Sequence, residues 1–364
     1  MSTLRYGIVG AGVIAPLHAA AIAAVDDSEL LGIADSNEAK ARERAEETGC
    51  AAFADYRELL ALEPDVVVVC TPHPSHPPLA IDALDAGAHV LCEKPIAVEV
   101  DDADAMIAAA ERAGKLLAVC FQQRFRPVIV RARELIEAGR LGTLVRVSVV
   151  DPLYRPEAYY GTAGWRGTWA GEGGGVLMNQ APHTLDLLCH LAGRPVRVRG
   201  LARRRSQPME AEDTAAALLE YEGGGIGTLA VSTVEAGVQR IELVGDRGRI
   251  EIVGETIAFQ EFDPPLSEHL VTAKEMFSAP AIVDVDGPVA LGSGGDHVDV
   301  HRDFASAIRN GHEPRIPASE ALWSLELANA IVLSSHLDRS VPVPVDRAAY
   351  RELLAGLRSG DAVL

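Results

Sequence analysis

The chain has 364 residues, a length that favours two domains of ordinary size over one. Its 48% hydrophobic and 23% charged residues exclude wholesale disorder and collagen-like repeats, and no apolar stretch approaches the roughly 18 residues that span a bilayer. The 33 basic against 52 acidic residues give a net charge of −19, so we expect neither nucleic acid nor a membrane as a partner.

The cysteines and the start of the chain indicate where the protein works. Five dispersed cysteines form no Cys-x-x-Cys pair, and four of them lie in or beside apolar segments; they are Cys50, Cys70, Cys92, Cys120 and Cys189. We interpret them as reduced, mostly buried thiols of a cytoplasmic protein. A glycine motif begins by residue 10, so we expect no signal peptide.

The first third of the chain alternates between strand and helix patterns. Residues 66–70 read Val-Val-Val-Val-Cys, an apolar run without alternation that is typical of a strand buried on both faces. Strands are predicted at 5–10, 29–34, 66–70, 89–92 and 116–120, and helices at 13–25, 37–48, 75–86 and 100–113. Repeated units of this kind predict a parallel sheet with right-handed crossovers, which is an α/β Rossmann domain.

After Phe125 the pattern changes to that of an α+β domain. A helix is predicted at 128–138, and further helices at 297–310 and 319–337. Alternating strands are predicted at 144–150, 196–201, 215–221, 226–234, 241–245 and 249–253, with hairpins at 223–225 and 246–248. Residues 262–295 carry no clear pattern. The sequence therefore predicts residues 1–124 as one domain and residues 125–364 as a second, with an open, mostly antiparallel sheet.

A glycine motif stands at the first strand-to-helix junction. Gly10, Gly12 and Ala15 form G-x-G-x-x-A, in which the first glycine permits a tight turn, the second lets a pyrophosphate approach the backbone, and the alanine allows close packing. Val13 and Ile14 open the helix whose N–H groups and dipole favour a diphosphate. Asp35 ends the second strand, where a carboxylate binds ribose hydroxyls and repels a 2′-phosphate. We expect NAD rather than NADP.

Lys94 follows the fifth predicted strand in Glu93-Lys94-Pro95. Ligands of doubly wound sheets bind beyond the carboxyl ends of the strands, so Lys94 is expected in the cofactor region. It is one of only four lysines in a chain that otherwise uses arginine, which favours a function that needs a compact ammonium group. A surface lysine before a turn is the alternative.

A second polar cluster follows three glycines, Gly173 to Gly175. Asn179 is predicted to cap a helix that contains Pro182 and runs to about Leu191. His183 would lie in its first turn, where the helix dipole favours the neutral imidazole that a base needs. Asp186, three residues on, shares its face and is a candidate to orient the ring. The alternative is a polar helix start with a locally satisfied histidine.

Together these motifs resemble the Gfo/Idh/MocA oxidoreductases, which include glucose–fructose oxidoreductase and inositol dehydrogenase. The resemblance rests on Gly10-Ala11-Gly12, on residues 70–76, on residues 86–95 and on residues 173–186. It implies a Rossmann domain followed by an α+β domain whose sheet forms a homodimer or homotetramer.

The resemblance also implies roles for particular residues. Lys94 and His183 would be the catalytic pair, and either of them is a candidate for the base. On the nicotinamide side it places Thr71, Pro72, His76, Glu93, Lys94 and Gln122. Arg124, Trp165 and Arg166 would lie near the cofactor or the substrate, and no metal is implied.

One position departs from the family pattern. Many members have aspartate four residues before the histidine, where this chain has Asn179. Asparagine cannot act as a base, but it can bind a sugar hydroxyl. The pair Asn179-Gln180 before the histidine is similar to the sequence at this position in the branch of the family that oxidises C3 hydroxyls of nucleotide sugars or glycosides.

We therefore predict an NAD-dependent dehydrogenase that oxidises a secondary hydroxyl of a sugar, glycoside or polyol. Hydride would pass to nicotinamide C4, with Lys94 and His183 as the acid–base pair. The alternatives are an NAD-using glycosidase, another redox-neutral sugar-modifying enzyme, and a non-catalytic NAD or sugar sensor.

Three further patterns leave structural and functional interpretations open. Aromatic residues cluster at Tyr154, Tyr159, Tyr160, Trp165 and Trp169, as candidates for stacking on a sugar ring or for an interface or core plug. His297 and His301 lie one helical turn apart, which suits a metal, but we expect a solvated helix face. Arg203 to Arg205 are candidates for a diphosphate, but we expect an exposed loop.

Overall fold

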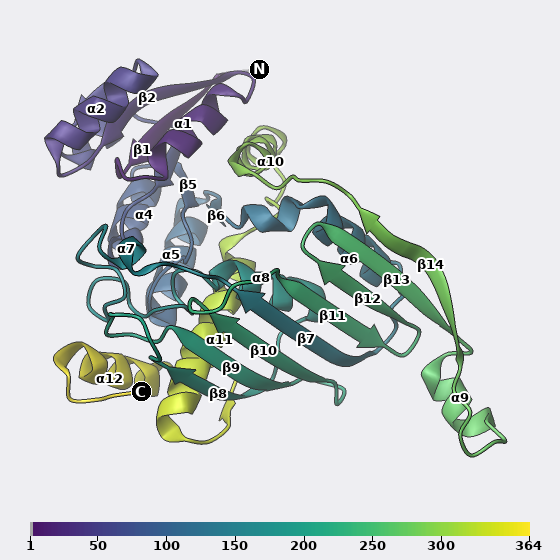
Figure 1. Ribbon diagram of the computed structural model, residues 1–364. Coiled ribbons are helices and arrows are strands. Elements are labelled where there is room, and N and C mark those ends of the chain that lie inside the picture. Colours follow the sequence, from purple (N-terminus) through teal and green to yellow (C-terminus); the bar gives the residue numbers. More distant parts are fainter. Residues whose placement is uncertain (1–2) are drawn as a thin grey trace. The chain divides into compact units, whose positions relative to one another are not determined.

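The computed structural model describes residues 3–364, which form two compact units (Figure 1). The first unit contains the described chain through Gln122, together with residues Gly171–Gly173 and Gly295–Leu325. The second contains Gln123–Ala170, Gly174–Gly294 and Glu326–Leu364. Each unit is thus assembled from separate stretches of chain, and the division into domains at residue 124 stays a prediction.

The first unit is built on a six-stranded sheet of order β3-β2-β1-β4-β5-β6, in which every neighbouring pair is parallel. The strands are β1 (Leu4–Val9), β2 (Ser28–Ala34), β3 (Ala51–Phe53), β4 (Val66–Val69), β5 (His89–Cys92) and β6 (Leu117–Val119). The connecting helices are α1 (Ala15–Ala23), α2 (Glu38–Thr48), α3 (Tyr56–Leu60), η1 (His73–Ser75), α4 (His76–Asp85) and α5 (Val100–Ala113). The predicted Rossmann sheet is confirmed.

The central strands explain why this sheet is stable. All four valines of β4 are fully buried, as expected for a strand covered on both faces. Burial of each such side chain contributes about 1.5–3 kcal/mol before the entropy of ordering is subtracted. The short elements β3 and α3 were not predicted, because three and five residues are too few to show a period.

A late segment of the chain returns to this unit. The helix α10 (His297–Asn310) packs against α1, and Arg309 donates hydrogen bonds to the carbonyl oxygens of Asp26 and Asp27. The expected solvated face at His297 and His301 is wrong. His301 is fully buried and only 12% of the His297 side chain is exposed, because this face of α10 lies against His18 of α1.

The second unit is built on a nine-stranded sheet of order β14-β13-β12-β11-β7-β10-β9-β8-β15. Its pairs are antiparallel except β7 with β10, so the predicted mostly antiparallel sheet is confirmed. The strands are β7 (Leu144–Pro152), β8 (Arg197–Arg203), β9 (Thr214–Glu220), β10 (Ile226–Ser232), β11 (Arg240–Gly245), β12 (Gly248–Val253), β13 (Thr256–Asp263), β14 (Ala281–Ala290) and β15 (Val341–Pro342).

Burial alternates along these strands, because one face of the sheet is covered by helices and the other is open (Figure 1). The helices α6 (Pro127–Glu137) and α8 (Pro182–Ala192) pack on the covered face. The remaining helical segments are η2 (Gln122–Phe125), α7 (Glu157–Tyr160), α9 (Leu266–Thr272), α11 (Ala318–Leu337), shared between the units, and α12 (Arg347–Ser359).

The segment without a clear pattern holds the end of β13, helix α9 and strand β14. Figure 1 shows α9 at the end of the β13–β14 pair where β13 ends and β14 begins. The residues of β14 are exposed almost throughout, so no apolar alternation marks this strand in the sequence. The two predicted hairpins, β9 with β10 and β11 with β12, are confirmed.

Two further features concern membrane-spanning helices and cysteines. No helix among residues 3–364 is long and apolar enough to cross a membrane. The five cysteines are free thiols; Cys50 is half-buried and the other four are buried, as predicted.

Candidate active site

The glycine loop joins β1 to α1 in the first unit. Gly10 has φ of +106°, and a Cβ on it would lie 2.6 Å from the carbonyl oxygen of Cys70, so only glycine fits. A Cβ on Gly12 would meet no atom within 4 Å, while Ala15 is fully buried. The loop therefore leaves open space beside the first N–H groups of α1, which fits the pyrophosphate of a dinucleotide.

Asp35 holds the glycine loop from the end of β2. One carboxylate oxygen accepts the N–H of Ala11 at 2.8 Å, and the other accepts the N–H of Asn37 at 2.8 Å. The carboxylate remains half-buried at the carboxyl end of its strand. It is thus fixed where an adenosine ribose is bound in sheets of this kind.

Lys94 lies in the turn after β5, half-buried and followed by a cis peptide bond to Pro95. His76, which is fully buried at the start of α4, links this turn to the end of β4. Its two ring nitrogens lie 2.9 Å from the carbonyl oxygen of Pro95 and 2.8 Å from that of Thr71. His76 therefore fixes the turn that carries Lys94, and the hydroxyl of Thr71 is in turn held by Ser75 at 2.8 Å.

His73 stands next to this turn as a neutral ring. Burial, the neighbouring His76 ring and the Lys94 ammonium lower the pKa of His73 to about 3. Its Nδ1 lies 2.9 Å from the carbonyl oxygen of Glu172, which can only accept, so Nδ1 carries the proton. Residues 171–173 are thereby joined to the loop after β4. Pro72 at the start of that loop is exposed.

Two further predicted cofactor residues differ in their surroundings. The carboxylate of Glu93 accepts the backbone N–H of Lys94 at 3.2 Å and lies 2.9 Å from Nε2 of His18. Gln122 follows β6, and its buried Oε1 has no hydrogen-bond partner among the described residues. A carbonyl oxygen in that state is an acceptor suited to a donor group of a bound ligand.

His183 is the second residue of α8 in the second unit and is half-buried. The predicted cap at Asn179 is wrong, because the chain makes a turn at 175–181 and the cap position is Ala181. Asn179 instead donates from Nδ2 to the hydroxyl oxygen of Tyr159 at 3.1 Å. The helix still begins immediately before His183, so this residue lies in the first turn, as predicted.

Two polar contacts anchor α8 within the three residues that follow His183. The hydroxyl of Thr184 donates to the carboxylate of Asp151 on β7, which also accepts from Gln239 at 2.7 Å. Asp186 receives both Nε and Nη2 of Arg124, at 2.9 and 2.7 Å, and both side chains are almost completely buried. A buried bidentate pair fixes geometry strongly.

The aromatic loop before α8 contains a small polar hub at Tyr159. The Arg166 guanidinium donates to the Tyr159 hydroxyl, and its carbon lies 4.3 Å from the Tyr159 ring centre and 4.7 Å from that of Trp165. Because Asn179 donates to the same hydroxyl, the hub links the loop to the residues before His183. Arg166, Trp165 and Asn179 are thus brought together.

The other aromatic residues divide between the two interpretations of this cluster, which are stacking on a sugar ring and packing in the core or an interface. Tyr160 and Trp169 are buried and belong to the core, whereas Tyr154 is 55% exposed. A hollow of about 790 Å³ lies beside this loop, lined by Tyr160, Arg166 and Arg204 among others. Its lining includes neither Asn179 nor His183, so we do not assign the substrate to it.

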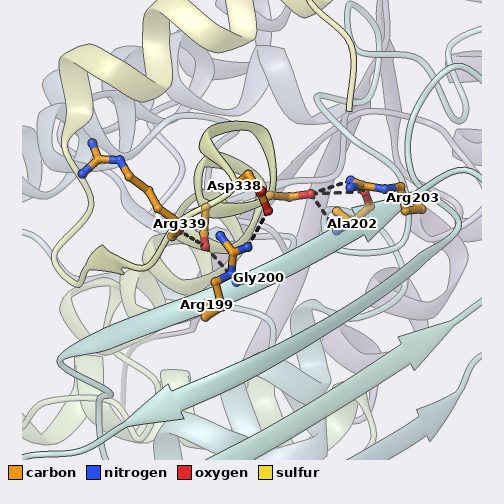
Figure 2. A network of polar contacts seen from close by, with 8 residues as sticks. Arg199, Gly200, Ala202, Arg203, Asp338 and Arg339 are labelled. Atoms are coloured by element: carbon orange, nitrogen blue, oxygen red, sulfur yellow. Dashed lines mark hydrogen bonds and ion pairs between the residues drawn. The ribbon is translucent and has the colours of Figure 1, made fainter.

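The basic run at 203–205 is partly engaged in structure. Arg203 ends β8, where it donates to the carbonyl oxygen of Ala202 at 2.7 Å and to the hydroxyl of Ser335 at 2.9 Å. Figure 2 shows this contact beside the ion pair of Arg199 with Asp338, which ties β8 to the end of α11. Arg204 donates to the carbonyl oxygen of Met209 at 2.9 Å. The three arginines are exposed, as expected.

Glu212 is a residue that sequence reasoning missed. It is buried, and its carboxylate accepts the N–H groups of Gly175 and Leu177, each at 3.0 Å. A Cβ on residue 175 would lie 1.9 Å from the Glu212 carbonyl oxygen, which explains why this position is Gly175. Asp151 and Tyr159 were also missed as positioning residues; an aspartate at the end of an apolar strand was the available signal for Asp151.

Comparison with known proteins supports the family resemblance that the motifs indicate. Residues 4–121 match the model of an oxidoreductase family with an NAD-binding Rossmann fold, and residues 129–251 match the GFO/IDH/MocA C-terminal domain. The myo-inositol 2-dehydrogenase of Thermotoga maritima is 30% identical, over 68% of this chain and 74% of that protein. The D-glucoside 3-dehydrogenase of Escherichia coli is 32% identical, over 68% and 76%.

A solved structure agrees over nearly the full length. The WlbA dehydrogenase from Bordetella pertussis, in complex with NADH and UDP-GlcNAcA, is 30% identical with a TM-score of 0.81, and the match covers 94% of this chain and all of that one. The chain therefore belongs to the Gfo/Idh/MocA family of NAD-binding oxidoreductases, dehydrogenases that act on hydroxyl groups.

Proposed function

We propose that this protein oxidises a secondary hydroxyl of a sugar, glycoside or polyol, with NAD as the hydride acceptor. The observation that carries the proposal is the structural support that each of the two candidate catalytic groups has within its own unit. Lys94 stands in a turn held by His76, and His183 starts a helix anchored by Asp151 and Arg124. Each unit supplies one of the two groups.

The two groups have complementary chemistry. A neutral imidazole at a helix N-terminus can accept the hydroxyl proton, and the lysine ammonium can stabilise the oxygen as it gains negative charge. NAD, when bound, supplies the acceptor for the hydride that leaves the same carbon. A desolvated lysine can also act as the base, so the proposal leaves the two roles interchangeable.

Cofactor binding is assigned to the first unit. Gly10, Gly12, Val13 and Ile14 would hold the diphosphate, and Asp35 the adenosine ribose, with discrimination against NADP. The nicotinamide side would be formed by Thr71, Pro72, His76, Glu93, Lys94 and Gln122. The unpartnered Oε1 of Gln122 supports this assignment.

Substrate binding is assigned to His183 and to further residues of the two units. Lys94, Asn179, Trp165, Arg166 and Tyr154 are the proposed contacts, with Arg124 as a positioning residue that acts through Asp186. Asn179 in place of an acid favours hydrogen bonding to a sugar hydroxyl, and C3 of a glucosyl unit is the proposed position. The name of the D-glucoside 3-dehydrogenase relative supports that choice.

The open face of the second sheet supports self-association. Leu201, Leu218 and Ile226 are more than half exposed on neighbouring strands β8, β9 and β10. Apolar side chains in such a row are typical of an interface, and we propose a homodimer or homotetramer through this sheet. Free thiols throughout agree with the proposed cytoplasmic location.

A panel of glycosides, nucleotide sugars, free sugars and inositols tests the proposal. NADH formation is followed for each compound, and the position of the new ketone is determined by NMR. The proposal expects a C3 ketone and NADH in equal amounts from at least one glucosyl compound. Bond cleavage without NADH would favour the redox-neutral alternative, and binding without any reaction would favour the sensor.

A further inference from the structure

A buried cluster of metal-ligating side chains lies within the first unit, next to the turn that carries Lys94, because its member Glu93 accepts the backbone N–H of Lys94. It contains His18 from α1, Glu93 after β5, Cys120 after β6 and His297 at the start of α10. One ligand atom from each residue lies within 4.8 Å of every other. Nε2 of His18 is 2.9 Å and Nε2 of His297 is 3.6 Å from the same oxygen of Glu93.

The spacing suits a four-coordinate ion. Zinc bonds of about 2.0–2.3 Å to nitrogen, oxygen and sulfur imply ligand atoms roughly 3.3–3.8 Å apart at the corners of a tetrahedron. The separations within the cluster, 2.9 and 3.6 Å between Glu93 and the two histidines and at most 4.8 Å overall, lie on both sides of that spacing. His18 and Cys120 are buried, while the side chains of Glu93 and His297 are 11% and 12% exposed, which leaves a route for an ion.

The cluster also supplies the support that metal-bound histidines usually have. Nδ1 of His18 lies 2.9 Å from Nε2 of His301, which is fully buried on the next turn of α10. If Nε2 of His18 binds a metal, Nδ1 keeps its proton and donates to His301. Metal-bound histidines typically donate their other N–H in this way, so the ring orientation is already set.

From this geometry we propose that His18, Glu93, Cys120 and His297 form a binding site for a divalent transition-metal ion, with zinc as the preferred ion. Two imidazoles, one carboxylate and one thiolate form a mixed N, O and S set that suits zinc and not magnesium or calcium. All four positions are taken by protein, as in structural sites. The ion joins α10 to the Rossmann unit, and His301 is its positioning residue.

Cysteine binds zinc as the thiolate, so binding of the ion displaces the proton of the Cys120 thiol to solvent.

Cobalt binding to the full-length protein tests the proposal. The protein is stripped with a chelator, checked for folding by circular dichroism, and titrated with Co²⁺. We expect one Co²⁺ per chain, with the visible bands of four-coordinate cobalt and a thiolate charge-transfer band, and displacement by one Zn²⁺. Zinc should also raise the melting temperature of the stripped protein.

Substitutions identify the ligands. C120S should abolish the charge-transfer band, while C189S, which removes a buried thiol outside the cluster, should keep it. H297Q should weaken Co²⁺ binding more than H301Q, for which a loss of about 10–100-fold is expected. H312Q, at an exposed histidine beyond α10, should bind Co²⁺ as the wild type does.

The proposal is overturned if the folded wild-type protein takes up no Co²⁺, or if C120S and C189S affect the band equally. If C120S does not fold, X-ray absorption of the zinc-loaded wild type decides. One sulfur together with nitrogen and oxygen ligands supports the site, and a zinc shell without sulfur contradicts it.

Discussion

The two sheets of the molecule differ in how they carry function. In the parallel sheet, the predicted cofactor residues Gly10, Asp35, Thr71 and Glu93 follow within two residues of strand ends. In the antiparallel sheet, the polar groups around His183 come from β7, α7, the loop before α8 and η2, which are distant in sequence. A parallel sheet brings strand ends to one edge, so local motifs can predict its candidate site, whereas the candidate residues of the second unit are held by long-range contacts.

The residues assigned to the diphosphate and the ribose differ from Lys94 and His183, so we expect that mutations can separate turnover from NAD affinity. Lys94→Met and His183→Ala should each lower turnover by roughly 10²–10⁴, the usual scale for a positioned acid or base, with little change in NAD affinity. Steady-state kinetics and NAD titration measure the two effects. Lys40→Met and His312→Ala, at exposed positions, are the matched controls. Near wild-type turnover in both site variants would contradict the assignment.

The long-range support of the second site is expected to rest on Arg124 and Asp186. Arg124→Leu removes the guanidinium that is paired with the buried Asp186 carboxylate, so the free energy of unfolding should fall by about 3–5 kcal/mol. Replacing both residues, as Arg124→Leu with Asp186→Leu, should cost less than the single change, because no unpaired charge remains. Denaturant unfolding of the two variants measures the difference; a double variant less stable than the single one would show that the pair itself is stabilising.

The preference of the first unit for NAD over NADP is expected to depend on one carboxylate, that of Asp35. Asp35→Ala should narrow the preference for NAD over NADP at least about fivefold, because repulsion between two charges about 4 Å apart is worth roughly 1–4 kcal/mol. Glu38→Ala, an exposed carboxylate in the first turn of α2, is the control. Equal affinity of the wild type for both cofactors would refute the role given to Asp35.

Trp165 tests whether the aromatic loop serves the substrate. Trp165→Ala should raise the Michaelis constant for the sugar about two- to tenfold, on the scale of one aromatic contact, and leave NAD binding nearly unchanged. Trp323→Ala, on α11, controls for the loss of a half-buried tryptophan. Unchanged kinetics would assign the loop to an interface.

His89 should give the parallel sheet a modest pH dependence. Burial and the nearby Lys115 ammonium lower the pKa of His89 to about 4, although Asp65 raises it. Because the folded pKa lies below the unfolded value of about 6.5, the contribution is complete above pH 6.5 and is lost as the pH falls toward 4. Melting temperatures of His89→Gln should therefore vary less between pH 7 and 4 than those of the wild type; equal slopes would contradict this.

The sequence predicted much of the fold, for identifiable physical reasons. The Val66–Val69 run, the Gly10 turn and the alternating strands from β7 to β12 carry strong local signals. Strand β14 and the return of α10 to the first unit carry none, because exposed residues show no period and the burial of His301 depends on α1. The same reason hid Glu212 and Asp151, whose partners are far along the chain.

The most direct test of the central claim follows the hydride itself. The best substrate of the panel is prepared with deuterium on the reacting carbon, and the reduced cofactor is analysed by mass spectrometry. We predict that the deuterium appears in NADH, in equal amount to the ketone formed. Release of the deuterium to water, or product formation without accumulated NADH, would contradict an NAD-dependent oxidation of the hydroxyl group.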